Sequence, residues 1–142
     1  FIAIARSKSL FVSRGDDSGT HNRELSIWIR SGLEPTGRWY IEYGYGMGKT
    51  LQYADKMSAY VMVDRSTWLA KRDQLRLVLL LDGDPLLDNP YHIISVNPER
   101  HPAVNLEGAQ QLIEWMTSRQ GQDMIKSITV DGEQLFIPAF YQ

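Results

Sequence analysis

The residues best suited to chemistry lie in two glycine-rich stretches, "SRGDDSGTH" (residues 13–21) and "GYGMGKT" (residues 44–50). Each stretch follows a strand-like segment and precedes a helical pattern, and each combines glycines with hydroxyl side chains and a basic residue. The first amides of a helix have no partner within the helix, and the helix dipole is positive there. Glycine lets an anion approach those amides closely. Such a pattern is typical of an anion-binding site.

Each stretch also has an ordinary structural explanation. Asp17 and Ser18 are common helix caps, and Arg14 is placed to pair with Asp16. A single stretch of this kind favours a structural role. Two of them in one short chain leave the structural and the anion-binding interpretations open.

Nucleotide-binding motifs do not fit the second stretch. A P-loop requires a glycine five residues before its final Gly-Lys pair, and Tyr43 stands at that position. The dinucleotide-binding fingerprint requires a glycine three residues after Gly46, where this sequence has Lys49. The spacing therefore argues against ATP and dinucleotides as ligands.

A hydrolase is the catalytic alternative, because Asp17, Ser18 and His21 are the residue types of a nucleophilic triad. The serine is not surrounded by the G-x-S-x-G turn of such enzymes. The chain has no cysteine, which excludes thiolate nucleophiles and thiolate zinc sites, and its histidines are not paired at metal-ligand spacing. We therefore expect neither an enzyme nor a metal site nor a cofactor.

Alternating strands and helices must position the two stretches, and this alternation predicts an α/β sheet. The expected strands cover residues 10–13, 38–43, 59–64, 75–81 and 91–97, the last of which contains His92. A helix is expected over residues 18–31, with Leu25, Trp28 and Ile29 on its inner face. Further helices are expected over residues 49–57 and 66–74, from the N-cap Asn105 onward, and after Ser118.

The composition of the chain limits the classes of protein to which it can belong. The 142 residues are 43% hydrophobic, which fits one globular domain or a piece of a larger one. The net charge of -2 argues against nonspecific nucleic-acid binding, which needs a concentrated basic surface. The apolar run over residues 75–81 is far shorter than the roughly 18 residues that a membrane-spanning helix needs. The chain begins with Phe1 rather than methionine, and we expect that an N-terminal part has been removed.

Several longer blocks carry a resemblance to a known family. They are "FVSRGDDSGTH", "GYGMGKTLQYAD", "YVMVDRSTWL", "LLDGDPLLDNPY", "ISVNPERHP" and "LIEWMTSRQGQDMI". In this order they resemble the tungstate-binding solute receptors of TupA type, over nearly the whole chain. The resemblance implies a type II periplasmic-binding-protein-like α/β three-layer sandwich, incomplete because the N-terminal half of its first lobe is absent. Residues 1–90 would form the second lobe with its anion-binding loops, and residues 91–142 a returning strand and C-terminal helices of the first lobe.

The same resemblance implies which residues bind the anion. Arg14 would be the charged ligand, and Met47 and Gly48 would offer backbone amides. The neighbouring donors would be Ser13, Ser18, Gly19 and Thr20. Asp64 and Arg65 match a block near the hinge, where an arginine–carboxylate pair would be structural. The chain departs from the family pattern at Tyr45, Lys49 and Ser66, and these departures bear on the identity of the ion more than on the fold.

The function implied is that of an extracytoplasmic solute-binding protein for a tetrahedral oxyanion. Tungstate comes first, molybdate second and sulfate a distant third, and the ion would be delivered to the permease of an ABC transporter. The expected location is periplasmic or extracellular, with no nucleic-acid partner. Loss of part of the first lobe would expose apolar residues and favour self-association of the fragment; these are Leu112, Ile113, Trp115 and Met116. The alternatives are the effector-sensing domain of a regulator and a hydrolase using Asp17 and His21.

Overall fold

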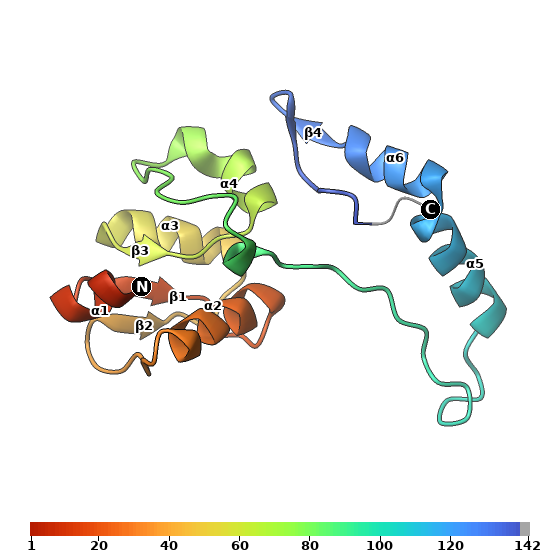
Figure 1. Cartoon of the computed structure of the whole chain (residues 1–142), viewed down its shortest axis with the longest axis horizontal. Coiled ribbons are helices and arrows are strands. Elements are labelled where there is room, and N and C mark those ends of the chain that lie inside the picture. The colour runs from red at the N-terminus through yellow and green to blue at the C-terminus, as the bar shows by residue number, and fades with distance from the viewer. Residues whose placement is uncertain (140–142) are drawn as a thin grey trace. The chain divides into compact units, whose positions relative to one another are not determined.

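The computed structural model describes residues 1–139, which fall into two compact parts (Figure 1). Unit 1 comprises residues 1–89, and unit 2 begins at Pro90. The division lies close to the domain boundary expected from the sequence, while the assignment of the two parts to lobes stays a prediction. Residues 140–142 of the second expected domain lie outside the described residues.

A parallel sheet of three short strands lies at the centre of unit 1 (Figure 1). Strand β1 (Phe11–Ser13) lies between β2 (Tyr40–Glu42) and β3 (Tyr60–Val61). In the register, Val12 is opposite Ile41 on one side and Val61 on the other. Because all three strands are parallel, their carboxyl ends meet at one edge of the sheet.

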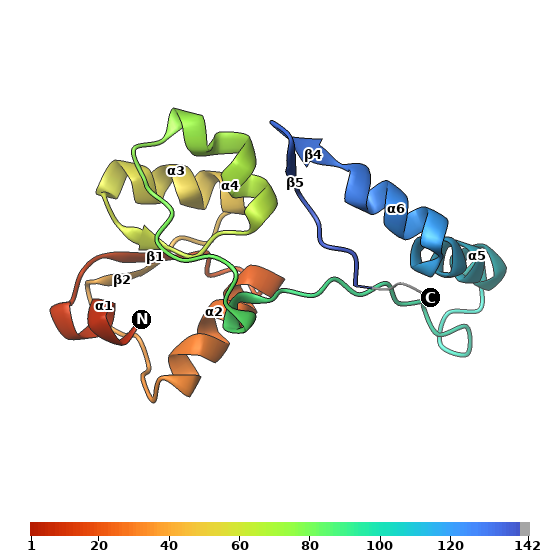
Figure 2. The same ribbon diagram turned by 45° about the horizontal axis from the view of Figure 1, so that its top comes forward.

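Helices cover both faces of this sheet, with α1 and α2 on one side and α3 on the other (Figure 2). Their bounds are α1 Ile2–Ser7, α2 Gly19–Arg30, α3 Met47–Met57 and α4 Arg65–Lys71. Two single turns of 3₁₀-helix follow, η1 Arg72–Gln74 and η2 Pro85–Leu87. The expected strands at residues 10–13, 38–43 and 59–64 and the expected helices of this unit are confirmed, whereas α1 was not expected.

The core of unit 1 forms on both faces of β1, because side chains alternate along a strand. Phe11 packs edge-on against Trp28 of α2, with ring centroids 5.3 Å apart. The next residue, Val12, faces the opposite layer and packs with Ala54 and Ala59. This gives unit 1 the α/β three-layer arrangement that the sequence predicts.

Of the three residues expected on the inner face of α2, Leu25 is half-buried, and Ile29 does not lie on that face. Trp28 is fully buried as expected, but the side chain of Ile29 is 75% exposed and Ile27 is buried instead. The i, i+3 and i+4 spacing that includes Trp28 also brings His21 and Glu24 inward, and both are buried. The sheet-facing side of α2 therefore carries two titratable residues.

The expected strands at residues 75–81 and 91–97 are wrong, because both segments are irregular in this structure. A strand requires a hydrogen-bonded neighbour, and neither segment pairs with a strand of the described residues. His92, expected in a buried strand, is exposed. Most of the apolar side chains here lie in solvent, among them Val78, Leu80, Tyr91 and Ile94, whereas Leu77 packs against the core around Val12.

Unit 2 contains two consecutive helices and a hairpin. Helix α5 (Leu106–Thr117) begins after the N-cap Asn105, and α6 (Arg119–Ser127) begins after Ser118, so both expected helices are confirmed. The antiparallel strands β4 (Thr129–Val130) and β5 (Glu133–Gln134) follow. Asp131 and Gly132 between them both have positive φ, as in the Asp-Gly turns that favour tight hairpins. No helix in residues 1–139 combines the length and the apolar character that crossing a membrane requires.

Candidate functional site

Three helices begin at the carboxyl edge of the sheet in unit 1. Helix α2 follows β1, α3 follows β2, and α4 follows β3. In open α/β sheets, ligands bind at this edge. The first loop (residues 14–18) and the second loop (residues 43–46) are joined there, because the amide of Gly44 donates to the carbonyl of Arg14 at 2.9 Å. The two stretches singled out in the sequence are therefore neighbours in space.

Gly15 allows the first loop to pass close to strand β2. Its φ is +60°, and a Cβ at this position would lie 2.9 Å from the Cβ of Glu42. Tyr43 N also donates to Ser13 O at 3.0 Å, which fixes the start of the loop. Ser13 itself is fully buried, so its side chain lies beneath the loop and not on its outer surface.

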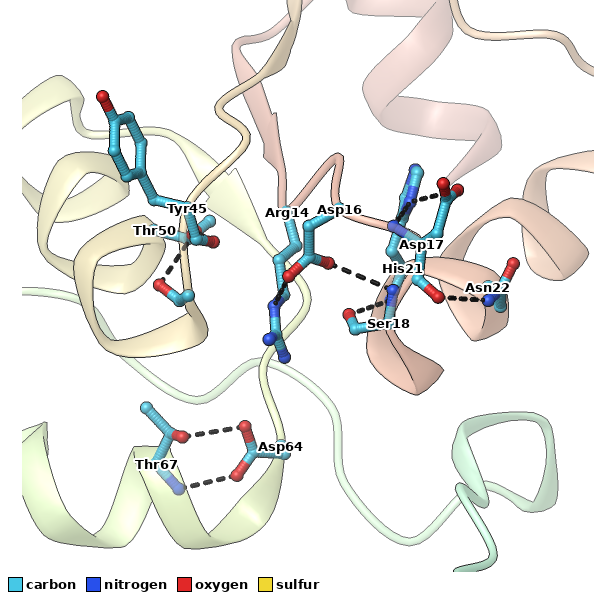
Figure 3. A network of polar contacts seen from close by, with 11 residues as sticks. Arg14, Asp16, Asp17, Ser18, His21, Asn22, Tyr45, Thr50, Asp64 and Thr67 are labelled. Atoms are coloured by element: carbon cyan, nitrogen blue, oxygen red, sulfur yellow. Dashed lines mark hydrogen bonds and ion pairs between the residues drawn. The ribbon is translucent and has the colours of Figure 1, made fainter. Parts of the chain in front are cut away.

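Asp16 holds the first loop together with its two carboxylate oxygens (Figure 3). Arg14 Nε donates to Oδ2 at 2.6 Å, and the amide of Ser18 donates to Oδ1 at 3.2 Å. Burial acts to raise the pKa of Asp16, but the hydrogen bonds from Ser18 and the charge of Arg14 outweigh it and hold the pKa below its ordinary value. Asp16 therefore stays ionised beside the guanidinium.

The contact with Asp16 uses only one edge of the Arg14 guanidinium. Its two terminal nitrogens make no hydrogen bond with any residue in the described part of the chain. These nitrogens form the planar pair of N–H groups that binds two oxygens of one anion. The structural pairing of Arg14 with Asp16 and the anion-binding hypothesis are thus compatible, because Asp16 orients the guanidinium and leaves its outer edge free.

The N-terminus of α2 lies directly after this loop. Ser18 is the N-cap, and its Oγ accepts a hydrogen bond from the amide of His21 at 3.4 Å. Within residues 1–139 the amides of Gly19 and Thr20 donate to no acceptor. They are available to an anion, and the helix dipole favours negative charge at this end.

Glu24 is a buried polar residue on the sheet-facing side of α2. Glu24 Oε1 accepts from Trp28 Nε1 at 3.0 Å and from Tyr40 Oη at 2.8 Å. Burial raises the pKa of Glu24 despite these hydrogen bonds, and burial with the nearby Glu24 charge raises the pKa of Tyr40. His21, one turn before Glu24, accepts the amide proton of Asp17 at Nδ1 with a distance of 3.0 Å.

The second loop leads into α3, whose N-cap is Gly46 and which has no side-chain cap. The amides of Met47 and Gly48 make no hydrogen bond with the described residues, as the anion-binding hypothesis requires. Thr50 Oγ1 turns back to the carbonyl of Tyr45 at 2.8 Å and fixes the loop. Lys49 lies over the Tyr45 ring, 5.3 Å from its centroid, so two of the three departures from the family pattern lie together.

The N-terminus of α4 is closed by its own cap. Asp64 accepts from the amide and the hydroxyl of Thr67, both at 2.8 Å, and from Ser66 Oγ at 2.6 Å. Burial opposes ionisation of Asp64, but these donors outweigh it and lower its pKa. Arg65 of the same block donates to Asp82, which lies outside the block expected to hold the arginine–carboxylate pair, at 2.9 Å. The third helix start is therefore less suited to an anion than the other two.

Two residues next to the candidate site were not found from the sequence. A Cβ at Gly19 would lie 3.1 Å from the Asn89 side-chain oxygen, and a Cβ at Gly48 would lie 2.9 Å from Lys71 Cε. Lys71 thus brings a positive side chain to the start of α3, and Asn89 brings an amide to the start of α2. No local spacing links residues so far apart in the chain, so only the tertiary structure reveals these contacts.

The geometry does not assemble the residues of the hydrolase alternative. A triad requires a hydrogen bond between the serine hydroxyl and the histidine ring. Here Ser18 Oγ instead accepts from the main chain of His21, and His21 Nε2 is buried without a hydrogen-bond partner among residues 1–139. The Asp17 carboxylate lies 3.8 Å from Nδ1, but its side chain is 97% exposed. In the same part of the chain, no cluster of three or more His, Asp or Glu side chains is placed to bind a metal ion.

Comparison with known proteins identifies the family. The sequence model of the PBP superfamily domain matches residues 3–120. The chain belongs to the PBP superfamily. The tungstate-binding protein TupA of Peptoclostridium acidaminophilum is 41% identical over 95% of this chain and 48% of its own length. This confirms the resemblance to the TupA type.

Solved structures agree. The tungstate ABC transporter structure from Geobacter sulfurreducens has a TM-score of 0.77 and 40% identity, covering 88% of this chain and 53% of that one. TupA from Desulfovibrio alaskensis G20 has a TM-score of 0.76 and 35% identity, covering 97% of this chain and 58% of that one. The PBP-like α/β fold is therefore confirmed. The chain spans about half the length of the curated relatives it matches.

Proposed function

We propose that this PBP superfamily chain forms one ligand-binding face of a solute-binding protein for a tetrahedral oxyanion, with tungstate first and molybdate second. One observation carries the proposal: the amides of Gly19 and Thr20, which have no acceptor within residues 1–139, begin a helix directly after the loop that presents the terminal nitrogens of Arg14. The names of the TupA relatives support tungstate as the ion.

The proposed mechanism of binding uses donors held in place before the ion arrives. Asp16 orients the Arg14 guanidinium, whose outer edge binds two oxygens of the ion. The amides of Gly19 and Thr20 bind a third oxygen and stabilise its charge through the α2 dipole. Met47 and Gly48 add amides from the start of α3, which follows the second loop, and this loop is joined to the first through the Gly44–Arg14 hydrogen bond. Little side-chain ordering then remains to oppose binding.

This donor arrangement favours a fully deprotonated dianion. A protonated phosphate carries an O–H group that needs an acceptor, and leaving it unpaired when buried costs free energy. We expect tungstate and molybdate to displace phosphate in competition calorimetry on the complete polypeptide that the gene encodes. Phosphate binding as tight as tungstate binding would overturn the proposed selectivity.

The wider context of the function follows the same proposal. The ion would be captured outside the cytoplasm and passed to the permease of an ABC transporter, with no chemical conversion and no nucleic-acid partner. A thermal-shift experiment separates this from the enzyme alternative. Tungstate should raise the melting temperature without being consumed, whereas turnover of a phosphate or sulfate ester at Asp17 and His21 would contradict a purely binding role.

The chain by itself is also proposed to self-associate through unit 2. Leu112 and Trp115 of α5 expose 51% and 39% of their surface, and no residue of α5 is buried. Exposed apolar groups of this kind favour contact with another copy. Light scattering should give a mass above that of one chain, and Leu112→Glu should lower it. A monodisperse monomer at high concentration would contradict this proposal.

A further inference from the structure

The main chain of Asp17 is held at its amide and at its carbonyl by two side chains of helix α2. Its amide donates to His21 Nδ1 at 3.0 Å, and its carbonyl accepts from Asn22 Nδ2 at 2.8 Å. The residue has a φ of 57°, a left-handed conformation that is uncommon for residues other than glycine. Its own side chain is almost fully exposed. The main chain of Asp17, and not its carboxylate, is therefore the part that the fold fixes.

This turn sets the shape of the candidate site. The left-handed residue directly precedes the N-cap Ser18, so its backbone direction determines where α2 begins. On its other side, Asp16 holds both the Ser18 amide and the Arg14 guanidinium. A rotation of the Asp17 peptide would move the partnerless amides of α2 relative to Arg14. Figure 3 shows the His21 ring turned back toward Asp17 from the first turn of the helix.

The hydrogen bond from the Asp17 amide defines which ring nitrogen of His21 carries the proton. Because Nδ1 accepts the Asp17 amide, the neutral ring has its proton on Nε2. Nε2 is buried and has no hydrogen-bond partner within residues 1–139. Within these residues the ring of His21 therefore forms a hydrogen bond only through Nδ1. A proton on Nδ1 would replace the acceptor by a donor facing another donor.

We propose that His21 is a positioning residue for oxyanion binding, acting through Nδ1 as the acceptor that fixes the Asp17 peptide. The inference rests on the proposed function, since the geometry that His21 fixes is that of the anion-binding loop. His21 does not touch the ion. It keeps the start of α2 and the Arg14 guanidinium in one binding geometry, so losing the acceptor weakens binding even though every direct ligand remains.

Two matched substitutions separate this role from simple packing. His21→Asn places an amide oxygen near the position of Nδ1 and retains the acceptor, whereas His21→Gln reaches the region of Nε2 and loses it. Tungstate affinity is measured by calorimetry on the complete polypeptide, and the apo melting temperature by calorimetric scanning. We expect His21→Asn to bind within about threefold of the parent and His21→Gln to lose about tenfold, the effect of one hydrogen bond.

The outcomes are distinguishable. Equal affinity losses in both variants, or an unchanged affinity in His21→Gln, would overturn the inference. If His21→Gln does not fold, His21→Phe replaces it, since it keeps an aromatic ring in this buried position but has no acceptor, and there an unchanged affinity is the overturning result. If the parent binds neither tungstate nor molybdate, the proposed function fails; amide hydrogen exchange at Asp17 then tests the His21 contact alone, and equal protection in the two His21 variants overturns that as well.

Discussion

Units 1 and 2 have similar helices but very different interiors. In unit 1, strand β1 and the helices α2 and α3 each contribute fully buried side chains, among them Val12, Trp28 and Leu51. In unit 2, the described part buries only Gly121 and Gln122, and α5 buries none of its side chains. Helical pattern and capping residues therefore mark where the helices of both units begin, but burial of an apolar helix face depends on a second layer, which unit 1 has.

The largest expected effect comes from one substitution made in both units. Leu51 of α3 is fully buried, whereas Leu112 of α5 is half-exposed. Removing a buried leucine side chain to alanine costs about 2–5 kcal/mol of unfolding free energy, because contacts are lost and a cavity remains. Leu51→Ala should show this loss in urea unfolding of residues 1–142. At a concentration below that of self-association, Leu112→Ala should change stability by less than about 0.5 kcal/mol.

The same two substitutions test whether another part of the protein covers α5. In the complete polypeptide, Leu112→Ala should cost more than in residues 1–142 if another part of the protein covers α5. Equal and large costs for Leu51→Ala and Leu112→Ala in residues 1–142 would contradict the difference in burial between the two units.

The second effect concerns the site, which lies in the well-packed unit. Arg14→Lys keeps the charge but loses the planar pair of N–H groups. If the terminal nitrogens bind the ion, tungstate affinity should fall by roughly ten- to a hundredfold, equivalent to about 1.5–3 kcal/mol. The apo melting temperature should change little, since Arg14 and Asp16 are part-exposed and such pairs contribute little to stability.

The opposite result has an equally clear meaning. A lowered apo melting temperature with an unchanged dissociation constant would show that Arg14 serves only the loop, through Asp16. The anion would then lie elsewhere. Calorimetric titration together with thermal unfolding on the same samples distinguishes the two results.

What the sequence predicted depended on how local the signal was. Ser18 was recognised as a cap, and the strand ending at Ser13 was placed correctly, because neighbouring residues determine both features. The position of the loop between β1 and the start of α2 followed from the same local pattern. Asn89 and Lys71 were missed because their contacts with Gly19 and Gly48 join distant parts of the chain.

The errors have the same origin. The apolar runs at 75–81 and 91–97 have strand-like composition, but strand formation depends on a pairing edge that no local pattern supplies. Ile29 was expected on the inner face of α2 because its side chain is apolar. In the structure Glu24 lies on that face instead, where it accepts hydrogen bonds from Trp28 and Tyr40. Polar residues satisfied by tertiary contacts are difficult to recognise from hydrophobic periodicity.

Glu24, buried on the sheet-facing side of α2, gives unit 1 a pH-dependent stability. Burial raises the pKa of Glu24 above its ordinary value of 4.5, so the folded state binds the proton more tightly than the unfolded state. The resulting stabilisation is complete below the ordinary pKa and is lost as pH rises through the raised, folded-state pKa. Glu24→Gln retains an acceptor for Trp28 and Tyr40 and should remove this dependence. Urea unfolding at several pH values measures it, and identical profiles for parent and variant would contradict the assignment.

The smallest effect compares two serine caps, one in each unit. Ser18 Oγ accepts the amide of His21 at 3.4 Å, and Ser118 Oγ accepts the amide of Gly121 at 3.2 Å. Replacing a serine cap by alanine costs about 0.5–2 kcal/mol, so Ser18→Ala and Ser118→Ala should lower stability by similar amounts. Only Ser18→Ala should also weaken tungstate binding, because Ser18 caps the helix whose first amides are proposed to bind the ion. Circular dichroism follows the helices and calorimetry the ligand. A loss of affinity in Ser118→Ala equal to that in Ser18→Ala would mean that binding follows overall stability and not the start of α2.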